Sequence, residues 1–217
     1  MHPKNLTIAL AGNPNSGKTT IFNIITGTRQ KVGNWPGVTV AKKEGRIHKF
    51  GYDLKIIDLP GTYSLTPYSI EEIVARNYVL DERPDVVVDI IDASNLERSL
   101  YLATQLRELD CKVLFALNMA DLARTRGMKI DADKLSRLLD VPVIFTVGNK
   151  NEGIDILLKQ AIKLAETDAT TPKKRNVRYS KDIESAITRL QQFIGEKTDG
   201  TTPYNIRWTS IKLLEDD

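Results

Sequence analysis

Short runs of Val, Ile and Leu alternate with amphipathic segments over the first two thirds of the chain. Five apolar runs are typical of strands covered on both faces: Leu6–Ala11, Leu54–Asp58, Val86–Asp92, Val113–Asn118 and Val143–Val147. Between them, apolar residues recur at helical spacing in Thr19–Thr26, Ile70–Leu80, Leu96–Leu109, Ala132–Leu139 and Ile154–Ala165. This alternation predicts an α/β domain with a mostly parallel sheet and helices on both faces, which binds ligands at the carboxyl ends of its strands.

Two parts of the chain depart from this alternation. A strand over about Val40–Phe50, closed by Gly51, is expected to pair antiparallel with the next strand as a hairpin at the sheet edge. From Thr167 onward, a polar stretch with the basic residues Lys173, Lys174, Arg175 and Arg178 reads as a solvated linker. Helices over about Lys181–Gly195 and Tyr204–Leu214 follow it. We therefore expect an α/β domain at 1–166 and a small all-α domain at 167–217.

Composition narrows the classes of function. The net charge of +3 is too small to favour nucleic acid as the main partner. The single cysteine, Cys111, excludes a disulfide framework, and His2 and His48 lie too far from it and from each other for a zinc or iron site of usual spacing. No stretch approaches the roughly 20 apolar residues that a membrane helix needs, so this piece is expected to be soluble by itself.

The strongest local signal is a complete phosphate-binding loop between the first strand and the first helix. It comprises Gly12, Asn13, Pro14, Asn15, Ser16, Gly17, Lys18 and Thr19, with Thr20 following. In such a loop the backbone N–H groups and the helix N-terminus converge on the β-phosphate. Lys18 is expected to bridge the β- and γ-phosphates, and the Thr19 hydroxyl to bind Mg²⁺. The loop predicts a P-loop NTPase.

The base is predicted to be guanine. Asn118, Met119 and Asp121 follow a buried strand, and the Asp121 carboxylate can accept from guanine N1–H and the 2-amine, whereas adenine lacks that amine. Asn118 is expected to brace the P-loop and the base. Val147, Gly148 and Asn149 follow the next strand, where a backbone N–H can meet guanine O6, although a plain strand-to-helix turn explains them nearly as well. Met119 stands where GTPases often have the Lys of an Asn-Lys-x-Asp motif, which favours moderate affinity for guanine nucleotides and their fast release.

Two further segments are expected to respond to the γ-phosphate. Asp58, Leu59, Pro60 and Gly61 end a strand; Asp58 can hold Mg²⁺ through water, and the Gly61 N–H can reach the γ-phosphate. Thr39, after Gly37 and Val38, is the candidate that closes on Mg²⁺. The segments Thr28–Val40 and Gly61–Ser69 are therefore expected to order with GTP and relax after hydrolysis. The sequence leaves the role of Asp89, inside an apolar strand, open between a switch contact and a hydrogen bond.

The sequence resembles the G domain of the FeoB family, ferrous iron transport protein B. The resemblance rests on Gly12–Thr20, on Val32–Val40 with its Gly-Asn-Trp-Pro-Gly-Val-Thr run, on Asp58–Ser64 and on Asp92–Arg98, and continues weakly to Leu213–Asp216. It implies a Ras-like G domain, a helical domain that slows nucleotide release, and a membrane-embedded transport domain of the same polypeptide outside this chain. It also implies a place at the cytoplasmic face of the bacterial inner membrane and an Fe²⁺ path elsewhere.

The catalytic residues are predicted to be Asn15, Lys18, Thr39 and Gly61. Thr62 stands where small GTPases often have a water-positioning Gln, so intrinsic hydrolysis is expected to be slow. An Asn at position 15 is similar to that of potassium-activated GTPases; the resemblance implies a K⁺ ion held by Asn15 and by carbonyls of Gly33 and Trp35. The alternative for Asn15 is that it only suits the backbone angles of the loop.

Two other functions stay open. A GTPase acting on RNA or ribosomes would carry a similar guanine site, but no RNA-binding module is visible. A GTP sensor that gates a partner without hydrolysis is compatible with Thr62. The sequence leaves oligomeric state open, a homo-oligomer included.

Overall fold

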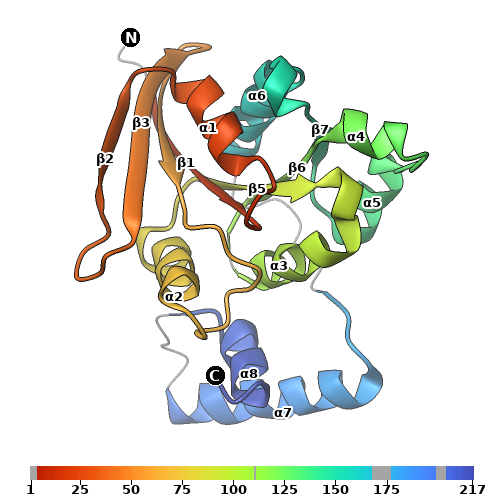
Figure 1. Ribbon diagram of the computed structural model, residues 1–217. Helices are drawn as coiled ribbons and strands as arrows, with labels where there is room; N and C mark the ends of the chain where they lie inside the picture. Colours follow the sequence, from red (N-terminus) through yellow and green to blue (C-terminus); the bar gives the residue numbers. More distant parts are fainter. Residues whose placement is uncertain (1–3, 110, 168–176, 199–203) are drawn as a thin grey trace.

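The computed structural model describes residues 4–109, 111–167, 177–198 and 204–217. Within these residues the chain forms one seven-stranded sheet in the order β2-β3-β4-β1-β5-β6-β7 (Figure 1). The strands are β1 (Lys4–Gly12), β2 (Gln30–Asn34), β3 (Ala41–Lys49), β4 (Tyr52–Asp58), β5 (Val86–Asp92), β6 (Val113–Asn118) and β7 (Val143–Phe145). The strands β4, β1, β5, β6 and β7 are parallel, and β2 and β3 add an antiparallel hairpin.

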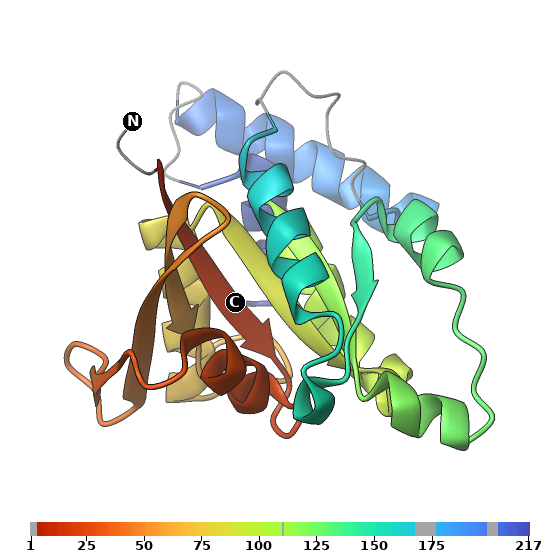
Figure 2. The ribbon, with the colours of Figure 1, turned by 90° about the horizontal axis from the view of Figure 1, so that it is seen from above.

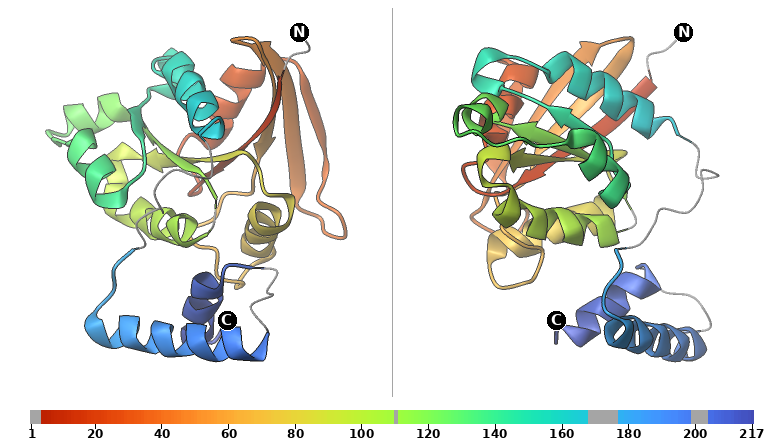
Figure 3. Two further views of the ribbon diagram at one scale, coloured as in Figure 1. Left: turned by 180° about the vertical axis from the view of Figure 1, so that it is seen from behind. Right: turned by 90° about the vertical axis from the view of Figure 1, so that its right-hand side faces the viewer.

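Helices cover both faces of the sheet. They are α1 (Lys18–Thr26), α2 (Ile70–Asn77), α3 (Leu96–Glu108), α4 (Ala120–Thr125), α5 (Ala132–Leu139), α6 (Ile154–Ala165), α7 (Lys181–Lys197) and α8 (Ile206–Leu214), with a π-helical turn at Tyr78–Glu82 and 3₁₀ turns at Ala93–Asn95 and Gly148–Lys150. Figure 2, seen from above, shows α1 and α6 on the near face of the sheet. Helices α2 and α3 lie on the other face, with α7 and α8 beyond them (Figures 1 and 3). The predicted fold class is confirmed.

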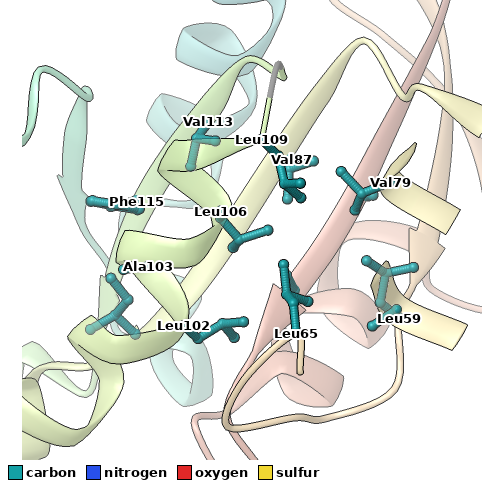
Figure 4. Close-up of a cluster of buried hydrophobic side chains, with 14 of the residues drawn as sticks. Leu59, Leu65, Val79, Val87, Leu102, Ala103, Leu106, Leu109, Val113 and Phe115 are labelled. Atoms are coloured by element: carbon teal, nitrogen blue, oxygen red, sulfur yellow. The ribbon is translucent and has the colours of Figure 1, made fainter. Parts of the chain in front are cut away.

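Strand β5 shows why the sheet has two cores. Its side chains alternate between the faces, so Val86 and Val88 enter the core under α1 and α6, while Val87 and Ile91 enter the core under α3. Figure 4 shows the second core, where Leu102 and Leu106, one helical turn apart, meet Val87 and Leu65. Full burial of one such Leu stabilises the fold by about 1.5–3 kcal/mol. The rigid sheet therefore fixes the strand ends that carry the predicted site.

The edge of the sheet differs from the prediction. The strand predicted over about Val40–Phe50 does pair antiparallel with β4, but it is not the edge, because β2 pairs along its outer side. The residues of β2 are largely polar and exposed, with Val32 70% exposed. An outermost strand with no buried face leaves no apolar alternation in the sequence, which is why it was missed.

The two C-terminal helices dock on α3 through charged groups around a buried aromatic residue. Trp208 of α8 is 7% exposed and joins the core that contains α3. Arg207 donates from Nε to Glu108 of α3 at 3.3 Å and, from both terminal nitrogens, to Glu184 of α7 at 2.9 Å. Burial raises the pKa of Glu108, and the guanidinium of Arg207 opposes that rise. Arg207 therefore ties α7, α8 and α3 together.

Among the residues described, none of the helices combines the length and the apolar character that crossing a bilayer requires. The basic residues Lys173, Lys174 and Arg175 of the predicted linker lie outside the described residues.

Candidate functional site

The P-loop connects β1 to α1 at the carboxyl end of the sheet, and two glycines shape it. Gly12 has φ +150°, and a Cβ there would lie 2.5 Å from the carbonyl oxygen of Ile90. Gly17 has φ +86°, and a Cβ there would lie 2.2 Å from Nδ2 of Asn118. Side chains are excluded at both positions, by backbone conformation as well as by space. The loop can therefore present its amides closely to an anion at the N-terminus of α1.

The remaining loop residues divide by exposure. Asn13, Ser16 and Lys18 are buried, whereas Pro14, Asn15, Thr19 and Thr20 are exposed at the open side of the loop. Asn15 has φ +66°, a left-handed conformation that Asn tolerates better than most residues. Within the described part of the chain, Asn13 Oδ1 and Ser16 Oγ are buried without a hydrogen-bond partner. Such orphaned polar atoms are typical of a site that a ligand or water completes.

Lys18 and Asp58 form an ion pair beneath the loop. Their side chains are only 9% and 7% exposed, and Lys18 Nζ donates to Asp58 Oδ1. Asp58 ends β4, which lies beside β1, so the parallel register brings the two groups together. The segment after Asp58 packs on the P-loop: a Cβ at Gly61 would lie 3.4 Å from Pro14, and the Thr62 N–H donates to the Gly12 carbonyl at 3.2 Å. Leu59 is buried in the core.

Asn118 links three segments of the predicted nucleotide site. Its Nδ2 donates to the Ser16 carbonyl at 2.9 Å, which fastens the end of β6 to the P-loop. Its Oδ1 accepts from the Gly148 N–H at 2.9 Å and from Thr146 Oγ1 at 3.3 Å, which fastens the loop after β7. The side chain is 3% exposed, so these bonds are shielded from water. Asn118 thus holds the P-loop and the loop predicted to contact the base in one arrangement.

Asp121, the predicted base-reading residue, lies in the first turn of α4 after Met119, which adopts φ +57°. Its Oδ2 lies 2.8 Å from Nζ of Lys150, and its Oδ1 accepts from the Leu122 N–H at 2.9 Å. The hydrogen bond from Lys150 holds the pKa of Asp121 below its ordinary value. Sequence reasoning missed Lys150; its one signal was its place next to Asn149, in the same predicted loop.

The Thr39 segment is not brought to the P-loop in this structure. Gly33 lies in β2 opposite Lys42, the Trp35 N–H donates to the Val40 carbonyl at 2.9 Å, and the Trp35 carbonyl accepts from the Val38 N–H at 3.3 Å. The tip of this hairpin, with Gly37 and an exposed Thr39, lies beside α2 and away from the start of α1 (Figures 1 and 2).

Trp35 anchors that hairpin. Its ring is 7% exposed and meets the ring of Tyr78 edge-to-face, with centroids 5.2 Å apart, while Nζ of Lys42 lies 4.9 Å from the Trp35 ring. The predicted K⁺ ligands Asn15, Gly33 and Trp35 therefore belong to two separate parts of this conformation.

The loop after Gly61 is held by side-chain contacts that were not predicted from the sequence. Ser64 Oγ donates to Glu72 at 2.7 Å, and the Leu65 N–H donates to Gln105 Oε1 at 2.6 Å. Arg98 lies 4.1 Å from the ring of Tyr63, and its carbonyl accepts from Asn13 at 3.4 Å. These contacts couple α2 and α3 to the segment predicted to respond to the γ-phosphate.

Asp89 is buried in the sheet beside β1. Its side chain is 1% exposed, and its Oδ2 has no hydrogen-bond partner among the described residues. Burial raises the pKa of this carboxyl to about 8. In the described ranges, no group of three or more His, Cys, Asp and Glu side chains is placed to hold a metal ion.

The comparisons with known proteins agree with one another. Residues 6–161 match the family model of ferrous iron transport protein B, and residues 179–217 match that of the FeoB cytosolic helical domain. The Fe(2+) transporter FeoB of Escherichia coli K12 is 49% identical over 224 residues, and the Fe(2+) transport protein A/Fe(2+) transporter FeoB fusion protein of Porphyromonas gingivalis is 42% identical over 215 residues. These matches cover 99% and 98% of this chain but 27% and 25% of the relatives, so the chain spans about a quarter of their length.

Solved structures extend the match to the fold. The cytosolic domain of the T. maritima FeoB iron transporter in GDP form II is 41% identical, with a TM-score of 0.92, and the match covers 98% of this chain and 82% of that one. The GMPPNP form of the same domain is 40% identical, with a TM-score of 0.90 and the same shares covered.

Proposed function

This chain belongs to the ferrous iron transport protein B family, and we propose that it binds GTP and hydrolyses it to GDP and phosphate as the cytosolic switch of an Fe²⁺ transporter. The relatives that it matches are named as Fe²⁺ transporters, and the T. maritima domain has been solved with GDP and with GMPPNP. The chain itself supplies the switch and its nucleotide site. The membrane-embedded transport domain of the same polypeptide is its proposed partner.

The observation that carries the proposal is the pair of bonds made by Asn118. One buried amide bonds the P-loop at Ser16 and the loop after β7 at Gly148, with Asp121 three residues further along the chain. A phosphate cradle and a base-reading carboxylate are thereby held on one rigid edge of the sheet. A carboxylate at the base position favours guanine, because guanine offers it two donors and adenine does not.

The phosphate end of the site fits a nucleotide that carries Mg²⁺. The ammonium of Lys18 is buried in an ion pair with Asp58, so a phosphate can replace Asp58 as the partner of Lys18 and leave the carboxylate free for other contacts. Asp58, through water, and the hydroxyls of Thr19 and Thr39 would then hold Mg²⁺. Bound Mg²⁺ supplies charge neutralisation at the β- and γ-phosphate oxygens. The amides of Gly12–Thr19 orient the phosphates, and the Gly61 N–H would meet the γ-phosphate.

Hydrolysis requires the hairpin tip to move. Thr39 lies on the outer hairpin in this structure, so its approach to the γ-phosphate requires Trp35 to leave Tyr78 or the tip to unpair. In the closed form, the amide oxygen of Asn15 and the carbonyls of Gly33 and Trp35 would hold K⁺, which supplies positive charge beside the transferred phosphoryl group. The residues of the chain position water and phosphate, and no general base is needed.

We also propose the division of the chain into a G domain at 1–166 and a helical domain at 167–217 that slows nucleotide release. Arg207 and Trp208 support it, because they connect α8 to α3, and α3 in turn holds the loop after Gly61 through Gln105. A path of direct contacts therefore joins the helical domain to the switch segment. The proposed location is the cytoplasmic face of the cell membrane.

The test is steady-state GTP hydrolysis with Mg²⁺ in KCl and in NaCl at equal ionic strength, for the native chain, Asn15→Ala and Asn15→Gly. Glycine suits the left-handed backbone at this position, whereas alanine does not, so the glycine variant removes the amide without straining the loop. We expect KCl to stimulate hydrolysis by the native chain and by neither variant.

Stimulation retained by Asn15→Gly and lost in Asn15→Ala would show that Asn15 only shapes the loop. If GTP binds but no cation increases the rate of hydrolysis, a sensor that does not hydrolyse GTP would be favoured. The buried Thr62, which stands in place of a water-positioning Gln, makes this a specific alternative. Salt-sensitive RNA binding that accompanies hydrolysis would favour the RNA-associated class.

A further inference from the structure

Both carboxylate oxygens of Asp121 are engaged within the chain. Lys150, at the end of the 3₁₀ turn Gly148–Lys150, lies 2.8 Å from Oδ2, and the Leu122 N–H lies 2.9 Å from Oδ1. The contact with Lys150 is charge-assisted and open to water, because the side chains of Lys150 and Asp121 are 53% and 35% exposed. It raises the pKa of Lys150 as well as lowering that of Asp121, so both groups are charged at neutral pH.

Two other cations at the end of α4 have different partners. Arg126 of the α4 C-cap donates to Ser94 Oγ at 3.1 Å, and Arg124 lies 5.8 Å from the ring of Phe145. Met119 already places an aliphatic group beside the P-loop, since its Cε would lie 3.6 Å from a Cβ at Gly17. Lys150 is therefore not needed as an apolar cover for the base, and what it contributes at Asp121 is its positive charge.

Guanine and hypoxanthine make different demands on a carboxylate. Guanine offers N1–H and the exocyclic 2-amine, which together require both oxygens. Hypoxanthine offers only N1–H and requires one. An ammonium held at Oδ2 competes with the 2-amine of guanine, but it can stay in place when hypoxanthine binds.

We propose that Lys150 is a specificity-determining residue that competes with the guanine 2-amine for Asp121, lowering both the affinity for guanine nucleotides and the preference for guanine over hypoxanthine. This inference rests on the proposed function, in which Asp121 reads the base. An exposed ion pair of this kind contributes little by itself, so the effect is a tuning of affinity and not a block.

The experiment measures the dissociation constants of ribose-labelled GDP and IDP for the native chain, Lys150→Gln and Lys163→Gln. Lys163 is exposed on α6 and provides the matched loss of one positive charge. The ratio of the two constants decides, because both ligands carry the same phosphates and long-range charge effects cancel in it. For Lys150→Gln we expect GDP to bind about threefold more tightly and the preference for GDP over IDP to rise about threefold, the size that an exposed pair allows.

Lys163→Gln is expected to leave the ratio unchanged. An unchanged or smaller ratio in Lys150→Gln would overturn the inference and leave the proposed function standing. Asp121→Asn separates the two failures. If this variant leaves the GDP-to-IDP ratio of the native chain unaltered, Asp121 does not read the base, and the proposed guanine site itself is wrong.

Discussion

The buried carboxyl of Asp89 predicts a stability that falls as the pH rises. Its pKa is about 8 in the folded chain, against an ordinary value of 3.8. Between these values the unfolded chain releases the proton and the folded chain keeps it, so the free energy of unfolding decreases by about 1.4 kcal/mol per pH unit. Between pH 5 and pH 7 this amounts to about 3 kcal/mol. Below about pH 4 both states are protonated, and the penalty vanishes.

Asp89→Asn removes this penalty, because an amide is neutral in both states and is close in shape to the protonated acid. The assay is urea unfolding of the nucleotide-free chain at pH 5, 6, 7 and 8. We expect the variant to be more stable than the native chain by about 1.6 kcal/mol at pH 5, and this difference to grow by about 3 kcal/mol by pH 7. The exposed Asp182, changed to Asn, is the control and is expected to follow the native curve. Parallel curves for Asp89→Asn and the native chain would refute the reasoning, because Asp89 would then be ionised in the fold.

Two further predictions concern the P-loop and the docking of the helical domain. Gly17→Ala is expected to weaken binding of labelled GDP at least tenfold and to lower stability by about 1–3 kcal/mol, since its methyl group meets Asn118; Gly127→Ala, with φ +73° and open space, is the control for backbone strain and should leave binding intact. Arg207→Ala leaves Glu108 buried without this guanidinium and is expected to lower stability in urea by about 3 kcal/mol; a loss below about 0.5 kcal/mol would mean that Arg207 does not anchor the helices.

The sequence predicted those parts of the fold that a local hydrophobic pattern identifies by itself. The central strands lie between two helical layers, so they appear as continuous apolar runs, and β5 and β6 were predicted with the bounds that the structure has. Strand β2 has a single neighbour and no buried face, and α4 is six residues long, so neither leaves a periodic pattern. Their positions depend on tertiary contacts, such as the Trp35–Tyr78 contact near the hairpin, which no local pattern encodes.

The same distinction applies to the site. That the P-loop, Asp58 and Asn118 converge follows from parallel strands ending at one edge, and the sequence was sufficient to predict it. The ion pair of Asp121 with Lys150 depends on where a flexible side chain settles. The pairing of Lys18 with Asp58 likewise reflects which opposite charge is within reach in this structure. Neither pair is visible in residue spacing.

These two pairs determine how the proposed nucleotide would bind. At each end of the site, a charge needed by the ligand is already held by the chain, so affinity reflects the difference between the contacts that form and those that break. At the phosphate end the ion pair that must be exchanged is buried. An ionised phosphate would replace the Asp58 carboxylate beside the Lys18 ammonium, so the buried ammonium would keep a negatively charged partner. At the base end the pair is exposed, and its loss costs little, because water solvates the released Lys150. We therefore expect the phosphate end to govern whether a nucleotide binds at all, and the base end to adjust which one binds best.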